Sequence, residues 1–151
     1  MDTSAMKKMN VLFLCTGNSA RSILGESIFN HFYASYGKAF SAGSQPTGAV
    51  NPVAMELLNA KGFTTQGLYS KDVRSFEQQG APEIDVVISV CDAAAQECPI
   101  WTGKGMPLRL HWPLPDPAKV TDEEIQRKIF EAVYAELRNK ISSFIGNMMP
   151  P

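Results

Sequence analysis

The chain has 151 residues, of which 44% are hydrophobic and 19% are charged, a composition typical of one globular domain large enough to bury its own core. Its formal net charge of −1 gives no electrostatic basis for binding nucleic acid or an acidic membrane surface. No apolar stretch approaches the roughly 20 residues that a membrane helix needs, and no apolar signal core follows the N-terminal lysines, so we expect a cytoplasmic protein.

The first half of the chain alternates strand and helix patterns. Residues 11–14 form a continuous apolar run, which is typical of a strand buried on both faces of a parallel sheet. Apolar residues at helical spacing predict a helix over residues 22–36, and residues 38–42 predict a short second strand. Residues 51–61 predict the next helix, because an asparagine cap is followed by proline in the first turn and a glycine comes after the last residue.

The second half continues this alternation. Residues 73–79 predict a short helix, and residues 84–90 form the strongest strand pattern after the first. Residues 108–112 predict a fourth strand, which is followed by a proline-rich loop. The pattern Thr-Asp-Glu-Glu at residues 121–124 predicts a capping box at the start of the last helix, which we expect to end near residue 145, before a glycine.

This order of elements predicts an α/β fold, a single-domain three-layer sandwich in which a four-stranded parallel sheet is flanked by helices. Right-handed crossovers would place helices on both faces of the sheet. We expect residues 1–8 to be a flexible N-terminal extension, residues 9–146 to form the domain and residues 147–151 to be a C-terminal tail. Ligands of such sheets bind beyond the carboxyl ends of the strands.

Cys15 ends the first predicted strand and opens a short loop with the pattern C-x5-R-S. The loop residues after it are Thr16, Gly17, Asn18, Ser19, Ala20, Arg21 and Ser22. A glycine-containing loop between a strand and a helix turns N–H groups inward, and the helix dipole adds positive charge, so the loop predicts a cradle for a tetrahedral oxyanion. Arg21 can hold two oxygens of that anion, and the same field favours the thiolate of Cys15, to which Ser22 can donate a hydrogen bond.

Two other interpretations of this loop have less support. Cys15 could be an ordinary buried cysteine at a strand end, but the arginine that follows it at the start of a helix favours a nucleophile in an oxyanion pocket. A nucleotide-binding loop is disfavoured, because neither a Gly-Lys-Ser/Thr ending nor a G-x-G-x-x-G pattern is present.

Cys91 ends the third predicted strand, so we expect it at the same sheet edge as Cys15. Cys98 follows seven positions later, which would place both side chains on one face of a helix, about 10.5 Å apart along its axis. A disulfide between them would require this segment to unwind or fold back. The alternatives are two structural cysteines, or a zinc site with His111, whose spacing does not match known zinc motifs.

Asp116 follows the fourth predicted strand and has proline on both sides, which stiffens the loop and restricts where the carboxylate can lie. A carboxylic acid above the oxyanion loop could protonate a departing oxygen. Asp-Pro is also a common turn signal, and the C-x5-R loop is what favours the catalytic interpretation.

Residues 15–22 and the Asp116-Pro117 pair resemble the low-molecular-weight protein tyrosine phosphatases. The Cys91-x6-Cys98-Pro99 pattern is similar to the arsenate reductases that are built on that fold and recycled by thioredoxin. Further similar stretches are residues 12–19, 41–43, 50–52, 90–92 and 111–112. The resemblance covers residues 9–146 and implies the low-molecular-weight phosphatase-like fold.

The resemblance also implies a role for each matching residue. Cys15 would attack the arsenic of arsenate, held by the loop amides and Arg21, while Asp116 protonates the leaving hydroxide. Cys91 would then attack Cys15 and release arsenite, and Cys98 would attack Cys91, leaving a disulfide for the reductant. The resemblance implies thioredoxin as electron donor, with glutaredoxin and glutathione as the alternative, phosphate and sulfate as substrate analogues, and no tightly bound cofactor.

Some members of the family bind a potassium ion near the loop. The oxygen donors at the matching positions are Asn18, Glu26, Ser41, Ser70 and Asp72. Tyr69 stands where several relatives have histidine. Glu26 and Asp72 could equally well be helix-surface or helix-cap residues that bind no ion. The potassium site and this structural interpretation therefore both stay open.

The oxyanion loop does not separate arsenate from phosphate, because the two anions share geometry and charge. A phosphatase acting on phosphotyrosine or small phosphate esters is therefore the alternative to an arsenate reductase. Residues 113–120 contain no aromatic residue to hold a substrate ring, and the two additional cysteines favour the reductase. A redox or oxyanion sensor is a third hypothesis, which predicts stoichiometric oxidation without turnover.

Overall fold

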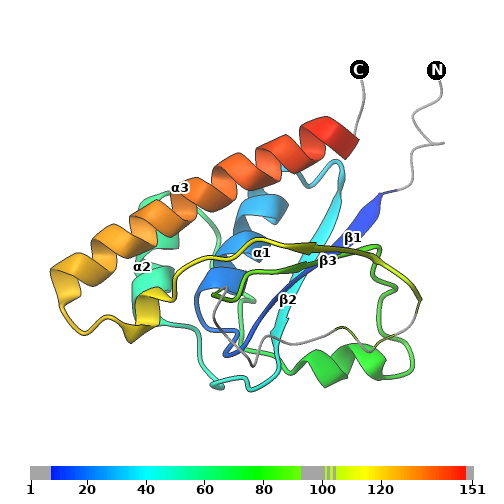
Figure 1. Ribbon diagram of the computed structural model, residues 1–151, viewed down its shortest axis with the longest axis horizontal. Helices are drawn as coiled ribbons and strands as arrows, with labels where there is room; N and C mark the ends of the chain where they lie inside the picture. The colour runs from blue at the N-terminus through cyan, green and yellow to red at the C-terminus, as the bar shows by residue number, and fades with distance from the viewer. Residues whose placement is uncertain (1–7, 93–100, 102, 104, 149–151) are drawn as a thin grey trace.

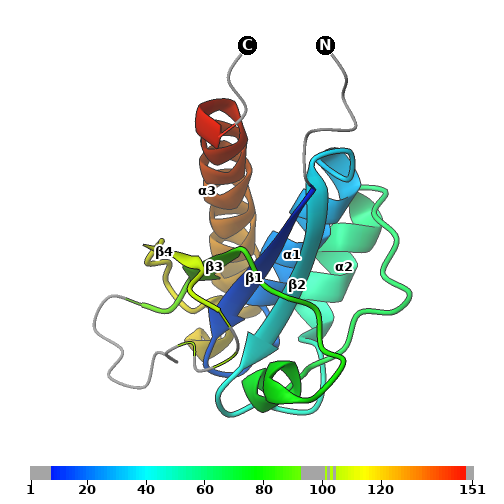
Figure 2. The same cartoon turned by 90° about the vertical axis from the view of Figure 1, so that its right-hand side faces the viewer.

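The computed structural model describes residues 8–92, 101, 103 and 105–148. The four strands of the described residues form one parallel sheet in the order β2-β1-β3-β4, with β1 between β2 and β3 (Figures 1 and 2). The strands are β1 (Met9–Cys15), β2 (Gly37–Gly43), β3 (Val86–Ser89) and β4 (Leu108–His111). The predicted four-stranded parallel sheet is confirmed, and each predicted strand matches one of these within a few residues.

One face of the sheet is covered by three α-helices (Figures 1 and 2). These are α1 (Arg21–Phe32), α2 (Pro52–Ala60) and α3 (Glu123–Met148). Val11 and Phe13 of β1 belong to the larger core, together with buried residues of all three helices. Burial of this apolar surface stabilises the helical layer on the sheet and fixes the start of α1 at the end of β1.

The opposite face of the sheet carries a smaller core. Leu12 and Leu14 of β1 are buried there with Phe76 of the 3₁₀ helix η2 (Val73–Glu77) and with Trp101. Because successive strand residues point to opposite faces, β1 is buried on both sides, as its continuous apolar run predicts. Helices therefore flank both faces, the α-helices on one and the short η2 on the other.

α1 ends at Phe32, whereas the sequence pattern predicts a helix to residue 36. The chain turns instead, with the Tyr36 N–H donating to the Tyr33 carbonyl at 2.9 Å. The Tyr36 carbonyl then accepts from Met9 N at 3.1 Å, which starts the pairing of β2 with β1. Sheet pairing therefore overrides the helical pattern of these residues.

α3 differs from the prediction at both ends. Its first turn is capped by Asp122, whose carboxylate accepts from Ile125 N at 3.0 Å, rather than by the threonine before it. The helix also continues through Gly146 to Met148, because Phe144 and Ile145 are buried and hold the last turns against the core. A single helical glycine costs only about 1 kcal/mol, which such burial offsets. No helix among the described residues, α3 included, is long and apolar enough to cross a membrane.

Candidate active site

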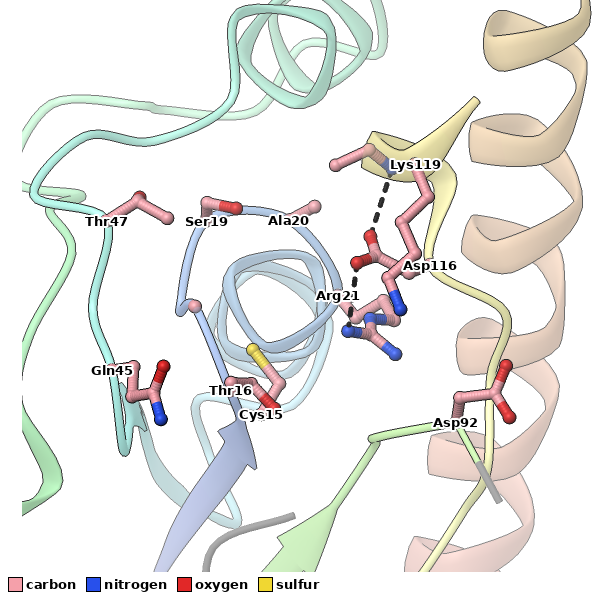
Figure 3. Close-up of a pocket in the computed structure, with 12 residues that line it drawn as sticks. Cys15, Thr16, Ser19, Ala20, Arg21, Gln45, Thr47, Asp92, Asp116 and Lys119 are labelled. Atoms are coloured by element: carbon pink, nitrogen blue, oxygen red, sulfur yellow. Dashed lines mark hydrogen bonds and ion pairs between the residues drawn. The ribbon is translucent and has the colours of Figure 1, made fainter. Parts of the chain in front are cut away.

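A pocket of about 490 Å³ lies beyond the carboxyl end of β1. It is lined by Cys15, Thr16, Gly17, Ser19, Ala20, Arg21, Gln45, Thr47, Asp92, Asp116, Ala118 and Lys119. Figure 3 shows Gln45 and Thr47 on one side of the pocket, Arg21 and Asp116 on the other, and Cys15 between them. The structure thus brings together the loop after β1 and the proline-rich loop after β4, as the sheet-edge rule predicts.

The loop backbone presents its N–H groups, not its carbonyls, to the pocket. Three loop carbonyls are engaged elsewhere, in hydrogen bonds from Gln45 N to Thr16 O (2.9 Å), from Thr47 N to Gly17 O (3.0 Å) and from Asn51 N to Ser19 O (2.8 Å). Within the described residues, no protein acceptor takes the N–H groups of Gly17, Ser19 and Ala20. These N–H groups at the start of α1 form a ready site for an anion.

Asn18 organises the nucleophile from the centre of the loop. It is fully buried and has a φ of 46°, a left-handed conformation that asparagine tolerates better than most residues. Its N–H donates to Cys15 Sγ at 3.2 Å, its Oδ1 accepts from Lys71 N at 2.6 Å, and its Nδ2 donates to Ser22 Oγ at 2.8 Å. The Lys71 contact fixes the orientation of the amide group.

Ser22 Oγ lies 2.9 Å from Cys15 Sγ. Because this hydroxyl already accepts from Asn18, its own hydrogen is free to point at the sulfur. Cys15 therefore receives one hydrogen bond from Asn18 N, and can receive a second from Ser22 Oγ, while it is only 2% exposed. Hydrogen bonds to a sulfur favour its anionic form, which is the nucleophilic form of cysteine.

Arg21 is the first residue of α1 and is buried, with only 7% of its surface exposed. Its Nη1 donates to Leu114 O at 3.1 Å and to Val90 O at 3.4 Å, and its Nη2 lies 3.5 Å from Asp116 Oδ2. Contacts from the segments after β3 and β4 thus hold one edge of the guanidinium group. Its planar, multiple-donor shape suits this arrangement together with an oxyanion.

Asp116 caps the 3₁₀ helix η3 (Pro117–Lys119), with its Oδ1 accepting from Ala118 N at 3.0 Å. The other carboxylate oxygen faces Arg21 (Figure 3). This arrangement places a carboxyl group on the wall of the pocket, beside Arg21.

Replacing Arg21 with lysine is expected to lower kcat/KM for the oxyanion substrate by about 10²-fold, because lysine cannot replace the fork of hydrogen bonds that guanidinium makes. The affinity for phosphate, measured by calorimetry, should fall in parallel. Arg109→Lys on the exposed edge strand β4 is the matched control and should match the wild type. An Arg21→Lys variant with wild-type phosphate affinity would contradict the role of Arg21 in anion binding.

The five oxygen-bearing residues of the predicted potassium site are engaged with protein groups. The Asn18 side-chain oxygen accepts from Lys71 N, as described above. Ser70 Oγ donates to Gly17 O at 3.2 Å. The Asp72 carboxylate pairs with Arg74, with a shortest contact of 2.8 Å. Ser41 Oγ donates to Glu26 Oε1, and Lys71 Nζ lies 3.6 Å from the same oxygen. Because a lysine ammonium already lies at the carboxylate, this donor set fits a potassium ion poorly.

Burial sets the electrostatics of the Glu26–Lys71 pair. Desolvation raises the pKa of Glu26, and the Lys71 charge and the Ser41 hydrogen bond offset part of that rise. Desolvation likewise lowers the pKa of Lys71, against the opposing charge of Glu26. The charge of each group therefore offsets part of the desolvation of the other.

The hydrogen bonding of Asp72 and Arg74 is a local surface feature. Hydrogen bonds from the Arg74 guanidinium, and next from the Arg74 backbone N–H, hold the pKa of the Asp72 carboxyl below its ordinary value. Asp72 also caps η2, with its side chain accepting from Arg74 N. These contacts match the helix-cap interpretation of Asp72.

Of the two cysteines in the Cys91-x6-Cys98 pattern, the structure describes only Cys91. Cys91 is fully buried, follows β3 and is disulfide-bonded, whereas Cys15 is a free thiol. Asp92, the next residue, lines the pocket, so Cys91 lies at the predicted sheet edge. Cys98 and Pro99 lie outside the described residues.

Several pocket residues were not predicted from the sequence. Gln45 and Thr47 follow β2, and Asp92 and Lys119 follow β3 and β4, so the sheet-edge rule could have found them. Lys71, which contacts the loop and does not line the pocket, could not be found that way. It reaches the loop because residues 43 and 72 form an isolated parallel bridge and Gly43 N donates to Lys71 O at 2.9 Å.

Comparison with known proteins gives consistent matches. The model of the family "Low molecular weight phosphotyrosine protein phosphatase" matches residues 10–149. The arsenate reductase of Shouchella clausii is 31% identical over 140 residues, covering 92% of this chain and 96% of that protein. A solved arsenate reductase in its phosphate binding state has a TM-score of 0.67 and 27% identity, covering 89% of this chain and 98% of its own. The thioredoxin-dependent arsenate reductase of Corynebacterium glutamicum shares the fold, with a TM-score of 0.63 and 24% identity over 92% of this chain and 63% of its own.

Proposed function

This chain belongs to the low molecular weight phosphotyrosine protein phosphatase family, and we propose that its pocket, like that of the arsenate reductases it resembles, binds arsenate and that Cys15 begins the reduction of arsenate to arsenite. The observation that carries the proposal is the pair of sulfur states at one sheet edge. Cys15 is a free, hydrogen-bonded thiol in the anion pocket, and Cys91 beside that pocket is in a disulfide. A phosphatase needs only the sulfur of Cys15, whereas a reductase of this kind needs the sulfurs of both Cys15 and Cys91.

The first step uses the oxyanion pocket. The Cys15 thiolate attacks the arsenic atom, so a sulfur–arsenic bond forms and one arsenic–oxygen bond breaks. Asp116 gives its proton to the departing oxygen, which leaves as water. The free N–H groups of the loop and the Arg21 guanidinium stabilise the negative charge that develops on the remaining oxygens.

The second step transfers two electrons. The Cys91 thiolate attacks Cys15 Sγ, a sulfur–sulfur bond forms, and the sulfur–arsenic bond breaks with its electron pair left on arsenic. Arsenic(V) thereby becomes arsenic(III) and leaves as arsenite, while two thiols become a disulfide. Cys98 then attacks Cys91, which frees Cys15 and leaves Cys91 oxidised. A disulfide-bonded Cys91 with a free Cys15 is compatible with this order.

The electron donor that we propose is thioredoxin. A dithiol protein can reduce a protein disulfide by the same exchange chemistry, and the arsenate reductase of Corynebacterium glutamicum with this fold is described as thioredoxin-dependent. Glutaredoxin with glutathione is the alternative donor. The two are distinguished by which system supports repeated turnover.

The lining of the pocket also bears on the choice between the two oxyanion chemistries. Among the described residues that line it, none is phenylalanine, tyrosine or tryptophan. Stacking on aromatic side chains is a common way to hold a substrate ring. A small inorganic anion requires no such surface, so the lining supports arsenate over phosphotyrosine.

The experiment that tests the proposal measures two activities of the same preparation. Arsenite formation from arsenate is followed with thioredoxin, thioredoxin reductase and NADPH, and aryl phosphate hydrolysis is followed in parallel. We expect many arsenite molecules per enzyme and weak hydrolysis. Efficient phosphotyrosine hydrolysis without arsenite formation would establish a phosphatase instead.

Replacing Asp116 with asparagine is expected to lower kcat for arsenate reduction by about 10²-fold, because the departing oxygen loses its proton donor. The asparagine side chain can still cap η3, so binding of phosphate should change little. Asp122→Asn at the start of α3 is the matched control, since Asp122 is also a capping aspartate. An Asp116→Asn enzyme with wild-type kcat would show that Asp116 is not the general acid.

A further inference from the structure

Lys71 is a nearly buried cation that does not touch the pocket. Its side chain is 10% exposed, and the Glu26 side chain that faces it is 14% exposed. The ammonium donates to Tyr69 O at 2.8 Å, lies 3.6 Å from Glu26 Oε1 and lies 4.2 Å from the centre of the Tyr69 ring. A carbonyl, a carboxylate and an aromatic face thus surround one positive charge.

The position of this charge is set by tertiary structure. Glu26 extends from α1, and Ser41 on β2 donates to the same carboxylate oxygen. Carboxylate and hydroxyl oxygens are the ligands that hard monovalent and divalent cations take in proteins. The carboxylate therefore has a cation partner that the chain itself supplies.

The backbone of Lys71 connects this charge to the nucleophile. Lys71 N donates to Asn18 Oδ1 at 2.6 Å, and Asn18 N donates to Cys15 Sγ at 3.2 Å. The neighbouring Ser70 donates to Gly17 O at 3.2 Å. The segment that carries the ammonium therefore holds the anion loop at two points.

We propose that Lys71 is a positioning residue whose ammonium group replaces a bound potassium ion, so that the anion loop of this protein is organised without potassium. The Glu26 carboxylate anchors the ammonium, the ammonium holds residues 69–71 in place, and these residues hold Asn18 in the orientation that serves Cys15. The proposal concerns the loop and does not depend on which oxyanion the enzyme converts.

The test compares the reduced protein in potassium chloride, sodium chloride and tetramethylammonium chloride at equal concentration. One readout is the melting temperature, and the other is the rate at which iodoacetamide alkylates Cys15, followed by mass spectrometry of the Cys15 peptide. Neither readout requires arsenate reduction. For the wild type we expect the same values in all three salts.

Lys71→Met is expected to lower the alkylation rate of Cys15 several-fold in sodium and tetramethylammonium chloride, because the loop loses its anchor. Potassium should then restore the rate at least about threefold and raise the melting temperature by a few degrees, because an ion that binds the native state stabilises it. Lys61→Met is the matched control, since Lys61 also pairs with a glutamate, Glu131 at 3.2 Å, and lies over Tyr134. It should respond to no salt.

Two results would overturn the proposal. The first is a potassium-specific change in either readout of the wild type, which would show that potassium binds in the presence of Lys71. The second is a folded Lys71→Met protein that no salt restores. Lys71→Gln serves the same purpose if the methionine variant does not fold, and the wild-type comparison needs no variant at all.

Discussion

Replacing Cys15 with serine is expected to abolish arsenate reduction and any aryl phosphate hydrolysis, with a loss of at least about 10⁴-fold in kcat. The serine hydroxyl keeps the size of the thiol but stays protonated near neutral pH and is a far weaker nucleophile. The hydrogen bonds that Asn18 N and Ser22 Oγ direct at Cys15 Sγ would stabilise a thiolate, and an uncharged hydroxyl gains much less from them. Both activities are measured on the same variant.

The control for this variant is anion binding. The loop N–H groups and Arg21 are unchanged in Cys15→Ser, so phosphate should still bind and raise the melting temperature. If the variant loses both activities but still binds phosphate, Cys15 is needed for the chemical step and not for anion binding. Retained turnover would remove Cys15 as the nucleophile.

Replacing Cys98 with serine is expected to limit the enzyme to one arsenite per protein molecule, because Cys15 can no longer be released from Cys91. The product would be a trapped Cys15–Cys91 disulfide, which peptide mass spectrometry identifies directly. Phosphate ester hydrolysis by a protein that has been reduced beforehand should be unaffected, because that chemistry needs Cys15 alone. Steady-state reduction would fall to the background rate.

Cys91→Ser is the matched control for the relay. It lacks the sulfur that attacks Cys15, so it should release no arsenite even in the first turnover. Repeated turnover of Cys98→Ser with thioredoxin would reject the three-thiol relay while leaving Cys15 as the nucleophile. The two variants therefore separate the second step from the third.

Much of the site could be predicted because its residues follow the ends of strands. A buried apolar run, a glycine-containing loop and a helix are local patterns, and parallel strands bring their carboxyl ends to one edge. Cys15, Arg21 and Asp116 could therefore be placed in one pocket from the sequence. Asn51 could be recognised as a cap in the same way, and its side chain accepts from Val53 N at 2.8 Å.

Other features depend on contacts that local patterns do not contain. Tyr33 and Tyr36 fit a helical pattern, but strand pairing at Met9 turns the chain there. The contact of Lys71 with Glu26 joins two segments through the bridge between residues 43 and 72. No spacing in the sequence indicates that bridge. The cap of α3 lies one residue away from its predicted position, because aspartate and threonine are both good caps and only the structure selects between them.

The reductase assignment is tested most directly by the number of arsenite molecules that the wild-type enzyme forms from arsenate with thioredoxin, thioredoxin reductase and NADPH. We expect arsenite in large molar excess over enzyme, with one NADPH oxidised for each arsenite. Arsenite at or below one molecule per enzyme with either the thioredoxin or the glutaredoxin system, together with efficient aryl phosphate hydrolysis, would contradict this assignment.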